Sequence, residues 1–159
     1  MGEYTEYEGN LDASGMRVAI VASRFSDDVT KLLLDGALRE LADRGLDPES
    51  VPVVWVPGAF EIPLVAKRLA ESGERDAVIC VGAVIRGDTP HFDYVAGECA
   101  AGVSRAALDS GVPVAFGVLT TEDRDQALAR AGGVEGNKGA EAAATAVEMV
   151  DLLRQLGKE

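Results

Sequence analysis

Aromatic residues, histidine and cysteine are scarce in this chain, and each scarcity excludes a kind of site or structure. Aromatic residues make up only 5% of the sequence, so each element can build little core alone, which favours an oligomer. His91 is the only histidine, so one chain cannot form a multi-histidine metal site. Cys80 and Cys99 form no CxxC pair, and we expect two free, buried thiols in a reducing compartment.

Basic clusters and long hydrophobic runs are also missing. The formal net charge is −12, which argues against nucleic acid and anionic membranes as partners. The longest apolar run, residues 77–85, is too short to span a bilayer. Residues 1–15 are acidic and lack the hydrophobic core of a signal peptide. We therefore expect a cytoplasmic protein with an N-terminal segment, residues 1–15, followed by one domain, residues 16–159.

Four continuous apolar segments predict buried strands. They are rich in β-branched residues and are bounded by turn residues, a pattern typical of strands buried on both faces. These segments are residues 17–23, 51–56, 77–85 and 112–119.

Amphipathic segments between these runs predict helices. Ser26 is the expected N-cap of a helix that stops at Gly45, and Thr121 is the expected cap of a short helix to about Arg130. Pro63 is expected in the first turn of another helix. The two longest predicted helices are residues 92–110 and 139–156. Alternating strands and helices predict a three-layer, flavodoxin-like α/β domain with a four-stranded parallel sheet.

Functional side chains follow each predicted strand. In open α/β sheets, ligands bind beyond the carboxyl ends of the strands. This rule selects four loops, which are residues 24–26 (RFS), 57–61 (PGAFE), 86–91 (RGDTPH) and 120–122 (TTE). We expect the site at this edge.

His91 is the natural proton carrier, because imidazole is the side chain that titrates near neutral pH. A lone histidine in this place is also often a cap or a satisfied polar residue. The preceding loop nearly matches a phosphate-binding loop, but Asp88 stands where the lysine should be, which argues against nucleoside triphosphates as ligands. Its backbone could still bind a phosphate at the start of the next helix, or it could be only a tight turn.

The remaining candidates each have a plain structural alternative. Glu61 could accept hydroxyl groups of a ligand or be a solvated loop residue. Phe25 could stack on a flat ring or plug the core, and the core interpretation is favoured for Phe116. Arg130 and Lys138 flank a loose glycine-rich loop, residues 131–137, and suit an anion, although surface cations are common.

Six segments in register resemble the motifs of lumazine synthases. The resemblance covers roughly residues 10–156, and the third segment is the most specific. One departure is Ser26, which replaces the usual Asn of the first motif. The segments are residues 24–26 (RFS), 57–63 (PGAFEIP), 82–95 (GAVIRGDTPHFDYV), 116–122 (FGVLTTE), 130–132 (RAG) and 136–139 (GNKG).

The resemblance implies a transferase that condenses 5-amino-6-(D-ribitylamino)uracil with 3,4-dihydroxy-2-butanone 4-phosphate. The product is 6,7-dimethyl-8-ribityllumazine, phosphate and water leave, and neither a metal nor a cofactor is needed. By resemblance, His91 moves protons. The residues assigned to the uracil substrate are Phe25 on the pyrimidine, Ala59, Phe60 and Glu61 on the ribityl chain, and the backbone of Ala83, Val84 and Ile85 on the uracil edge.

The phosphate is assigned by resemblance to Asp88 and Thr89 at a helix start, with Arg130 as its ion-pair partner and Lys138 nearby. Phe116 and Arg130 come from the neighbouring subunit. The family forms homopentamers, and some members build sixty-subunit shells. The N-terminal segment then adds to a neighbour's sheet, and functional coupling to riboflavin synthase is expected. The sequence does not choose between pentamer and shell.

Two other functions compete with this one. A phospho-receiver module of the same fold class needs a Lys after the last strand, where this chain has Thr120 and Thr121. A shell protein that has lost catalysis is opposed by the intact His91, Arg130 and Glu61.

Overall fold

A four-stranded parallel sheet forms the centre of the molecule. The computed structural model describes residues 3–157. The strand order is β2-β1-β3-β4, and every neighbouring pair is parallel. The carboxyl ends of the strands therefore lie along one edge of the sheet. The strands are β1 (Val18–Ser23), β2 (Val53–Val56), β3 (Ala77–Ile85) and β4 (Val114–Thr121).

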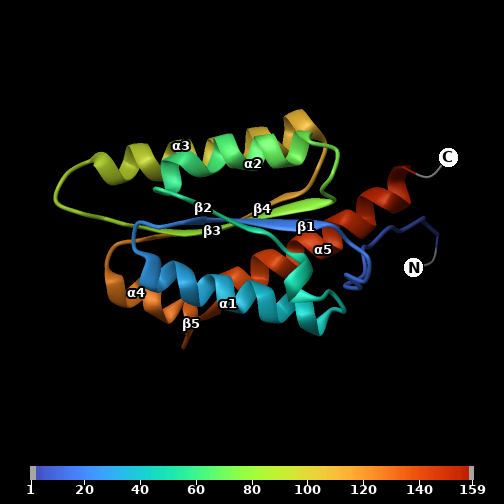
Figure 1. The fold of residues 1–159 in the computed structure, drawn as a ribbon, viewed down its shortest axis with the longest axis horizontal. Coiled ribbons are helices and arrows are strands. Elements are labelled where there is room, and N and C mark those ends of the chain that lie inside the picture. Colours follow the sequence, from blue (N-terminus) through green and yellow to red (C-terminus); the bar gives the residue numbers. More distant parts are fainter. Residues whose placement is uncertain (1–2, 158–159) are drawn as a thin grey trace.

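Helices cover both faces of this sheet (Figure 1). Two helices lie on one face, α2 (Ile62–Glu71) and α3 (His91–Ser110). The opposite face carries α1 (Asp27–Asp43), α4 (Arg124–Ala129) and α5 (Lys138–Gly157). Short 3-10 turns precede β2 and α2, namely η1 (Pro48–Ser50) and η2 (Ala59–Glu61). The three layers confirm the predicted flavodoxin-like fold. In the part of the chain that the structure describes, none of the helices combines the length and the apolar character needed to cross a membrane.

The two central strands are buried on both faces, which explains their continuous apolar sequences. Every residue of β1 is buried, and so is every residue of β3 except Ile85. One core cluster joins Ile20 to α1 and α5, and a second joins Val21 to α2 and α3. Cys80 and Cys99 lie in the second cluster as free, buried thiols, as predicted.

Four strand boundaries differ from the predictions by one or two residues, at the starts of β1, β2 and β4 and at the end of β4, and two of these shifts have clear local reasons. β2 begins at Val53 instead of residue 51, because Val51 ends the η1 turn and Pro52 has no N–H to donate to a ladder. β4 runs to Thr121 instead of Leu119, because its pairing with β3 continues to the Ile85–Thr121 pair. The first shift shortens β2 at its amino end, and the second extends β4 at its carboxyl end. In both strands the carboxyl end stays at the common edge of the sheet.

The predicted cap of the short helix α4 was wrong. Asp123 caps this helix, since its Oδ1 accepts a hydrogen bond of 2.8 Å from the backbone N–H of Gln126. Thr121 instead ends β4 and donates its hydroxyl to the Asp123 carbonyl at 2.9 Å.

The glycine-rich segment after α4 is a β-hairpin, so its description as a loose loop was wrong. β5 (Ala131–Gly133) pairs antiparallel with β6 (Gly136–Asn137). Gly132 and Gly136 adopt φ angles of 105° and 86°, which favour glycine. The backbone N–H of Lys138 donates to the Arg130 carbonyl at 2.9 Å. The hairpin therefore brings Arg130 and Lys138 together at its base.

Helix α5 starts in direct contact with α1. Asn137 joins the two helices, because its Nδ2 donates to the Leu32 carbonyl at 3.1 Å while its Oδ1 accepts from the Ala140 N–H at 3.0 Å. A Cβ at Gly139 would collide with the carbonyl oxygen of Leu33. Asn137 and Gly139 thus set the place where α5 begins, and with it the place of Lys138.

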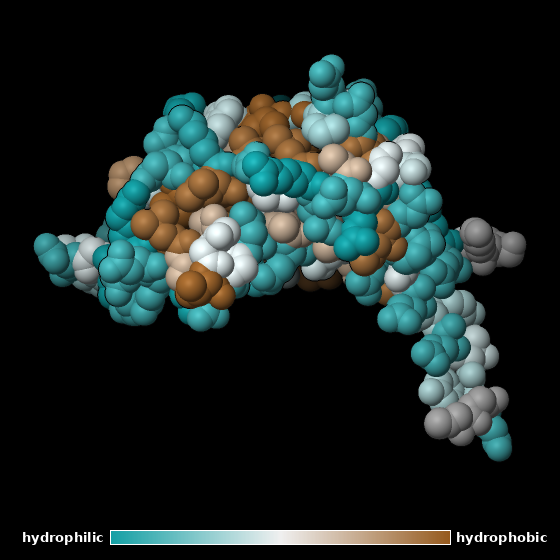
Figure 2. Space-filling model, turned by 90° about the horizontal axis from the view of Figure 1, so that it is seen from below, coloured by the Kyte–Doolittle hydropathy of each residue, from teal (hydrophilic) through white to brown (hydrophobic). Residues whose placement is uncertain are grey.

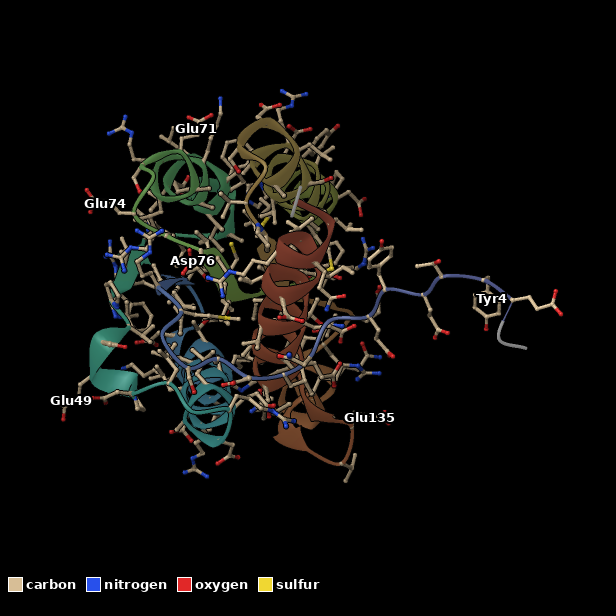
Figure 3. All side chains as sticks on the ribbon, turned by 90° about the vertical axis from the view of Figure 1, so that its right-hand side faces the viewer. Tyr4, Glu49, Glu71, Glu74, Asp76 and Glu135 are labelled. Carbon is tan, nitrogen blue, oxygen red and sulfur yellow. The ribbon has the colours of Figure 1, made fainter. Side chains whose placement is uncertain are left out.

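The N-terminal segment follows α5 and then leaves the body. The Asn10 N–H donates to Asp151 Oδ2 at 2.9 Å, and Gln155 Nε2 donates to the Glu8 carbonyl at 2.8 Å. Beyond these contacts the chain stands clear of the domain (Figure 2). Tyr4 lies far from the helices (Figure 3), and its exposed fraction is 67%. Residues 3–7 therefore contribute little to the fold of their own chain.

Asp76 ties three elements together at the amino end of the sheet. Glu71 and Glu74 point outward from the same region, whereas Asp76 lies over the body (Figure 3). Its carboxylate accepts from the Arg17 backbone N–H at 2.8 Å and pairs with Arg17 Nη2 at 3.1 Å and Arg154 Nη2 at 3.4 Å. Burial alone would raise the pKa of Asp76, but the hydrogen bonds from Arg17 and the two cations outweigh it and hold that pKa below its ordinary value.

We expect Asp76→Asn to lower the free energy of unfolding by about 1–2 kcal/mol at pH 7, because Asn cannot form the ion pairs. A lowered pKa in the folded state stabilises the protein above the unfolded pKa of about 3.9 and ceases to do so as the pH falls through the folded value. Urea unfolding should therefore show the gap to wild type closing below about pH 4. Asp35→Asn is the matched control, since its ion pair with Arg39 is exposed and its loss should cost under about 0.5 kcal/mol. A gap that is unchanged at pH 3 would contradict this role.

Candidate functional site

The loops after the four strands meet at one edge of the sheet, as predicted. Two of them are joined by backbone hydrogen bonds, from the Arg24 N–H to the Val56 carbonyl at 2.8 Å and from the Phe25 N–H to the Pro57 carbonyl at 3.0 Å. These bonds place the loop after β1 beside the loop after β2. The side chain groups on the two loops can therefore act on one ligand.

Phe25 presents an open ring to solvent. Its exposed fraction is 74%, which excludes the core-plug interpretation within a single chain. The residue that follows it, Ser26, has φ 61° and ψ 44°, the left-handed conformation. Residues 24–26 connect the end of β1 to the start of α1 and leave Phe25 outside the core. The predicted role of Phe25 as a stacking surface is sterically open.

Ser26 occupies the predicted N-cap position of α1, but its side chain makes no capping hydrogen bond. Its carbonyl instead accepts from the N–H groups of Val29 and Thr30, both at 3.1 Å. The predicted capping hydroxyl was therefore wrong, and the backbone conformation is what the position demands. Asn tolerates left-handed backbone better than Ser does, which gives a physical reason for the Asn usual in lumazine synthases.

We expect Ser26→Asn to raise the free energy of unfolding by about 0.5–1 kcal/mol, because it relieves part of the left-handed strain. Ser26→Ala is the matched control. It keeps the strain and removes only a hydroxyl that caps nothing, so it should stay within about 0.5 kcal/mol of wild type. Thermal and urea unfolding of the three proteins measure both effects. A loss of more than about 0.5 kcal/mol of unfolding free energy in Ser26→Ala would show that the hydroxyl caps α1.

The loop after β2 folds into η2 and exposes two of its side chains. Ala59 is buried, whereas Phe60 and Glu61 are exposed. The Glu61 N–H donates to the Gly58 carbonyl at 3.2 Å, and Glu61 Oε1 lies 3.3 Å from where a Cβ at Gly58 would stand. The carboxylate of Glu61 is thus turned back toward Gly58.

The last residues of β3 extend past the end of β1. Pairing of the two strands stops at Ala22 and Val81, while pairing with β4 continues to Ile85. The N–H groups of Val78 and Arg86 donate to β4, so the even positions between them face β4 and the odd positions face β1. Ala83 and Ile85 therefore direct their backbone groups to the β1 side of β3, past the last residue paired with β1, whereas the backbone groups of Val84 face β4.

His91 is the first residue of α3 and is exposed. Its N–H donates to Thr89 Oγ1 at 3.4 Å, and the cap residue, Pro90, supplies no side-chain cap. Asp88 and Thr89 lie in the exposed loop just before it. A long helix with an uncapped start favours an anion there, so the loop can hold a phosphate beside the imidazole.

A cleft of about 410 Å³ lies along β4 and contains the two predicted cations. Arg130 and Lys138 line it together with Phe116, Glu135 and Glu141. Arg130 Nη1 donates to the Gln126 carbonyl at 3.0 Å, and Lys138 Nζ lies 3.8 Å from Glu141 Oε1. The side chain of Phe116 is only partly buried, so the favoured core interpretation describes only part of its environment.

The structure therefore gathers the predicted residues into two groups. One group lies on the loops after β1, β2 and β3, and the other lines the cleft on β4, whose lining includes none of Phe25, Glu61 and His91. Sequence reasoning missed Arg86, which pairs with Glu122 and Asp93, and Asn137, which sets the start of α5. Within residues 3–157, no three side chains of His, Cys, Asp and Glu are grouped in a way that could hold a metal ion.

The fold is that of the open α/β sheets that bind ligands where their parallel strands end, and at this edge an exposed histidine begins a helix. Residues 15–154 match the family model described as 6,7-dimethyl-8-ribityllumazine synthase. The chain belongs to this family.

Curated relatives agree over almost the whole chain. A 6,7-dimethyl-8-ribityllumazine synthase of Syntrophus aciditrophicus is 57% identical, covering 96% of this chain and 99% of its own. Proteins of the same name from Thermus thermophilus and Protochlamydia amoebophila are 57% and 56% identical. They cover 93% and 95% of this chain, and 94% and 88% of their own lengths.

Proposed function

We propose that this enzyme condenses 5-amino-6-(D-ribitylamino)uracil with 3,4-dihydroxy-2-butanone 4-phosphate to 6,7-dimethyl-8-ribityllumazine, the penultimate step of riboflavin biosynthesis. Family membership over residues 15–154 supports the reaction. The observation that carries it is the shared edge, where an exposed phenyl ring, a carboxylate and the only imidazole of the chain follow three adjacent strands.

The uracil substrate fits the loops after β1, β2 and β3. The exposed Phe25 ring stacks on the pyrimidine. Ala59, Phe60 and Glu61 hold the ribityl chain, with the Glu61 carboxylate accepting from its hydroxyl groups. Of Ala83, Val84 and Ile85, the alternation along β3 supports Ala83 and Ile85 as the residues that bind the uracil edge through their backbone. The backbone groups of Val84 face β4, which argues against a direct hydrogen bond from this residue to the uracil.

The phosphate-bearing substrate fits the start of α3. Asp88 and Thr89 contact the phosphate through backbone N–H groups and the threonine hydroxyl, since a carboxylate would repel a phosphate. Arg130 forms an ion pair with the phosphate, and Lys138 adds a second positive charge. To bind these two side chains, the phosphate must displace their present partners, which are the Gln126 carbonyl for Arg130 and Glu141 for Lys138.

His91 moves the protons of the reaction. The amine of the uracil attacks the ketone, and the carbinolamine loses water to form an imine. Loss of a proton next to the imine then expels the phosphate and leaves an enol. The enol takes up a proton to become a ketone, the ribitylamino nitrogen attacks this ketone, and loss of a second water closes the ring. Each step needs a group that accepts and returns a proton near neutral pH, and an imidazole one residue from the phosphate loop can serve all of them. Holding two substrates together supplies much of the remaining acceleration.

We also propose that the site is completed between subunits of a homopentamer. Phe25, Glu61 and His91 come from one chain, and Phe116, Arg130 and Lys138 from its neighbour. The separation of the two groups in one chain supports this division. So does an apolar groove of about 350 Å³ on the β4 side, lined by Leu108, Met149 and Leu153, which a neighbouring chain would cover.

The N-terminal segment supports the same assembly. Residues 3–7 stand clear of their own domain, and β2 is an edge strand paired only with β1. We propose that residues 1–15, which include two outside the described range, pair with a neighbour's sheet, and that residues 16–159 form the catalytic domain. The pentamer either stands alone or builds a sixty-subunit shell, and it couples functionally to riboflavin synthase. We place the enzyme in the cytoplasm, where its two thiols stay reduced.

Mixing both substrates with purified protein tests the function. Absorbance of the lumazine product should appear far faster than in the uncatalysed mixture, and omission of either substrate should abolish it. A protein that binds both compounds without accelerating the condensation would be the inactive shell protein considered above. A protein that binds neither would leave the signalling module as the better explanation.

A further inference from the structure

The guanidinium of Arg86 connects the ends of two strands to the start of α3. Arg86 directly follows β3, and its Nε donates to Glu122 Oε1, just past β4, at 2.9 Å. Its Nη2 donates to Asp93 Oδ1, in the first turn of α3, at 3.3 Å. Its Cζ lies 4.4 Å from the centre of the Phe92 ring. We call Arg86, Phe92, Asp93 and Glu122 the Arg86 clamp.

The clamp holds both ends of the segment that carries the proposed phosphate and proton-transfer groups. This segment is residues 87–91, and it lies between Arg86 and Phe92. Among the described residues, the structure gives this segment one hydrogen bond to a side chain, the 3.4 Å contact from the His91 N–H to Thr89 Oγ1. The segment has little support of its own. Its place relative to the sheet therefore depends on the clamp.

We propose that Arg86 is a positioning residue, which fixes the 87–91 segment so that Asp88, Thr89 and His91 share one geometry. The inference rests on the proposed function for the identity of the substrate. A misplacement of about 1 Å in such a segment can cost roughly 10²-fold in rate. Arg suits the task because its planar fork binds two carboxylates while its face lies on an aromatic ring, which Lys cannot reproduce.

The charges of the clamp argue against direct phosphate binding by Arg86. One guanidinium faces two carboxylates, so the clamp carries a net charge of −1 from Arg86, Asp93 and Glu122. Such a group repels a phosphate. Electrostatics alone therefore predicts that removal of Asp93 or Glu122 strengthens phosphate binding, whereas positioning predicts that it weakens binding. The two accounts give opposite signs.

Whether phosphate binding becomes stronger or weaker can be measured without turnover, by titrating the protein with inorganic phosphate and observing His91. His91 is the only histidine, so histidine-labelled protein gives one imidazole signal in an NMR titration. Glu122→Ala should raise the dissociation constant for inorganic phosphate about tenfold, and Asp93→Ala should act in the same direction. The Glu122 side chain is 62% exposed, so its removal should leave the fold intact, and the melting temperature checks this. Glu122→Gln gives a second, gentler variant with the same expected sign.

Steady-state kinetics of Arg86 variants distinguish positioning from a role in stability alone. Only positioning predicts a loss that is confined to the phosphate-bearing substrate. Arg86→Gln and Arg86→Lys should both lower kcat/KM for the butanone phosphate roughly 10- to 100-fold, with KM for the uracil within about twofold of wild type. Glu98→Gln, an exposed carboxylate in the same helix but outside the clamp, should match wild type in every assay.

Failure of this inference and failure of the proposed function look different. Wild-type protein that forms no lumazine would overturn the function, while the phosphate titration would still decide the role of the clamp. Active wild-type protein whose Glu122→Ala variant binds phosphate as tightly or more tightly would overturn the positioning role. Full activity in Arg86→Lys would do the same, because it would show that charge alone suffices.

Discussion

Gly139→Ala should destabilise the protein by at least about 3–5 kcal/mol, or prevent folding altogether. The added methyl group would collide with the backbone carbonyl of Leu33, and backbone in the middle of a helix cannot swing aside as a side chain can. Relief would require α5 to move away from α1, which opens the core around Leu33 and Ala143. The hydrogen bond from Asn137 to the Leu32 carbonyl would be lost with it.

Urea unfolding of Gly139→Ala beside Gly157→Ala gives a matched comparison. Both changes replace glycine by alanine in α5, but a Cβ at Gly157 meets nothing within 4 Å. Gly157→Ala should therefore be neutral or stabilise by up to about 1 kcal/mol through higher helix propensity. Equal stability of the two variants would show that close contact at Gly139 does not fix the start of α5.

His91→Ala should slow turnover at saturating substrates by roughly 10²-fold or less, at or below the lower end of the range for general acid–base catalysis. The residue is exposed at the first position of α3, so the variant should fold and bind as wild type does. Residual activity is expected because both substrates are still held together. Steady-state rates with both substrates saturating measure the effect, with Glu98→Gln from the same helix as the control. An unchanged rate would remove His91 from the mechanism.

The fold was predictable because its two central strands are covered on both faces. Residues such as Ile20 and Ile79 lie in unbroken apolar segments, and only a buried parallel strand needs such a segment. Boundaries that depend on single contacts were not predictable. The cap of α4 could have been Thr121 or Asp123, since both are good capping residues, and three-dimensional placement decides between them. The hairpin at 131–137 was missed because glycine adopts positive and negative φ angles about equally well, so the sequence does not show which backbone conformation these residues take.

The candidate site shows the same division. His91, Phe25 and Glu61 were found because the loops after parallel strands share one edge, and the structure places all three there. Their chemical roles remain predictions. The Arg86 clamp was missed because Arg86 and Glu122 lie 36 residues apart and meet only when β3 and β4 pair. A pattern along the chain gives no signal for such a contact.

Mixed rings test most directly the central claim that the catalytic site is shared between neighbouring chains. Each of His91→Ala and Arg130→Ala is expected to keep only a reduced, residual rate, which the variant measured alone defines. They are unfolded together in equal amounts and refolded, with each variant refolded alone as the control. A site is complete only where a chain with His91 meets a neighbour with Arg130 in the right order, about one site in four in a head-to-tail ring. Lumazine formation should rise well above both parents, to roughly a quarter of the wild-type rate. Mixed rings that form without any gain over the parents would show that each chain carries its own complete site.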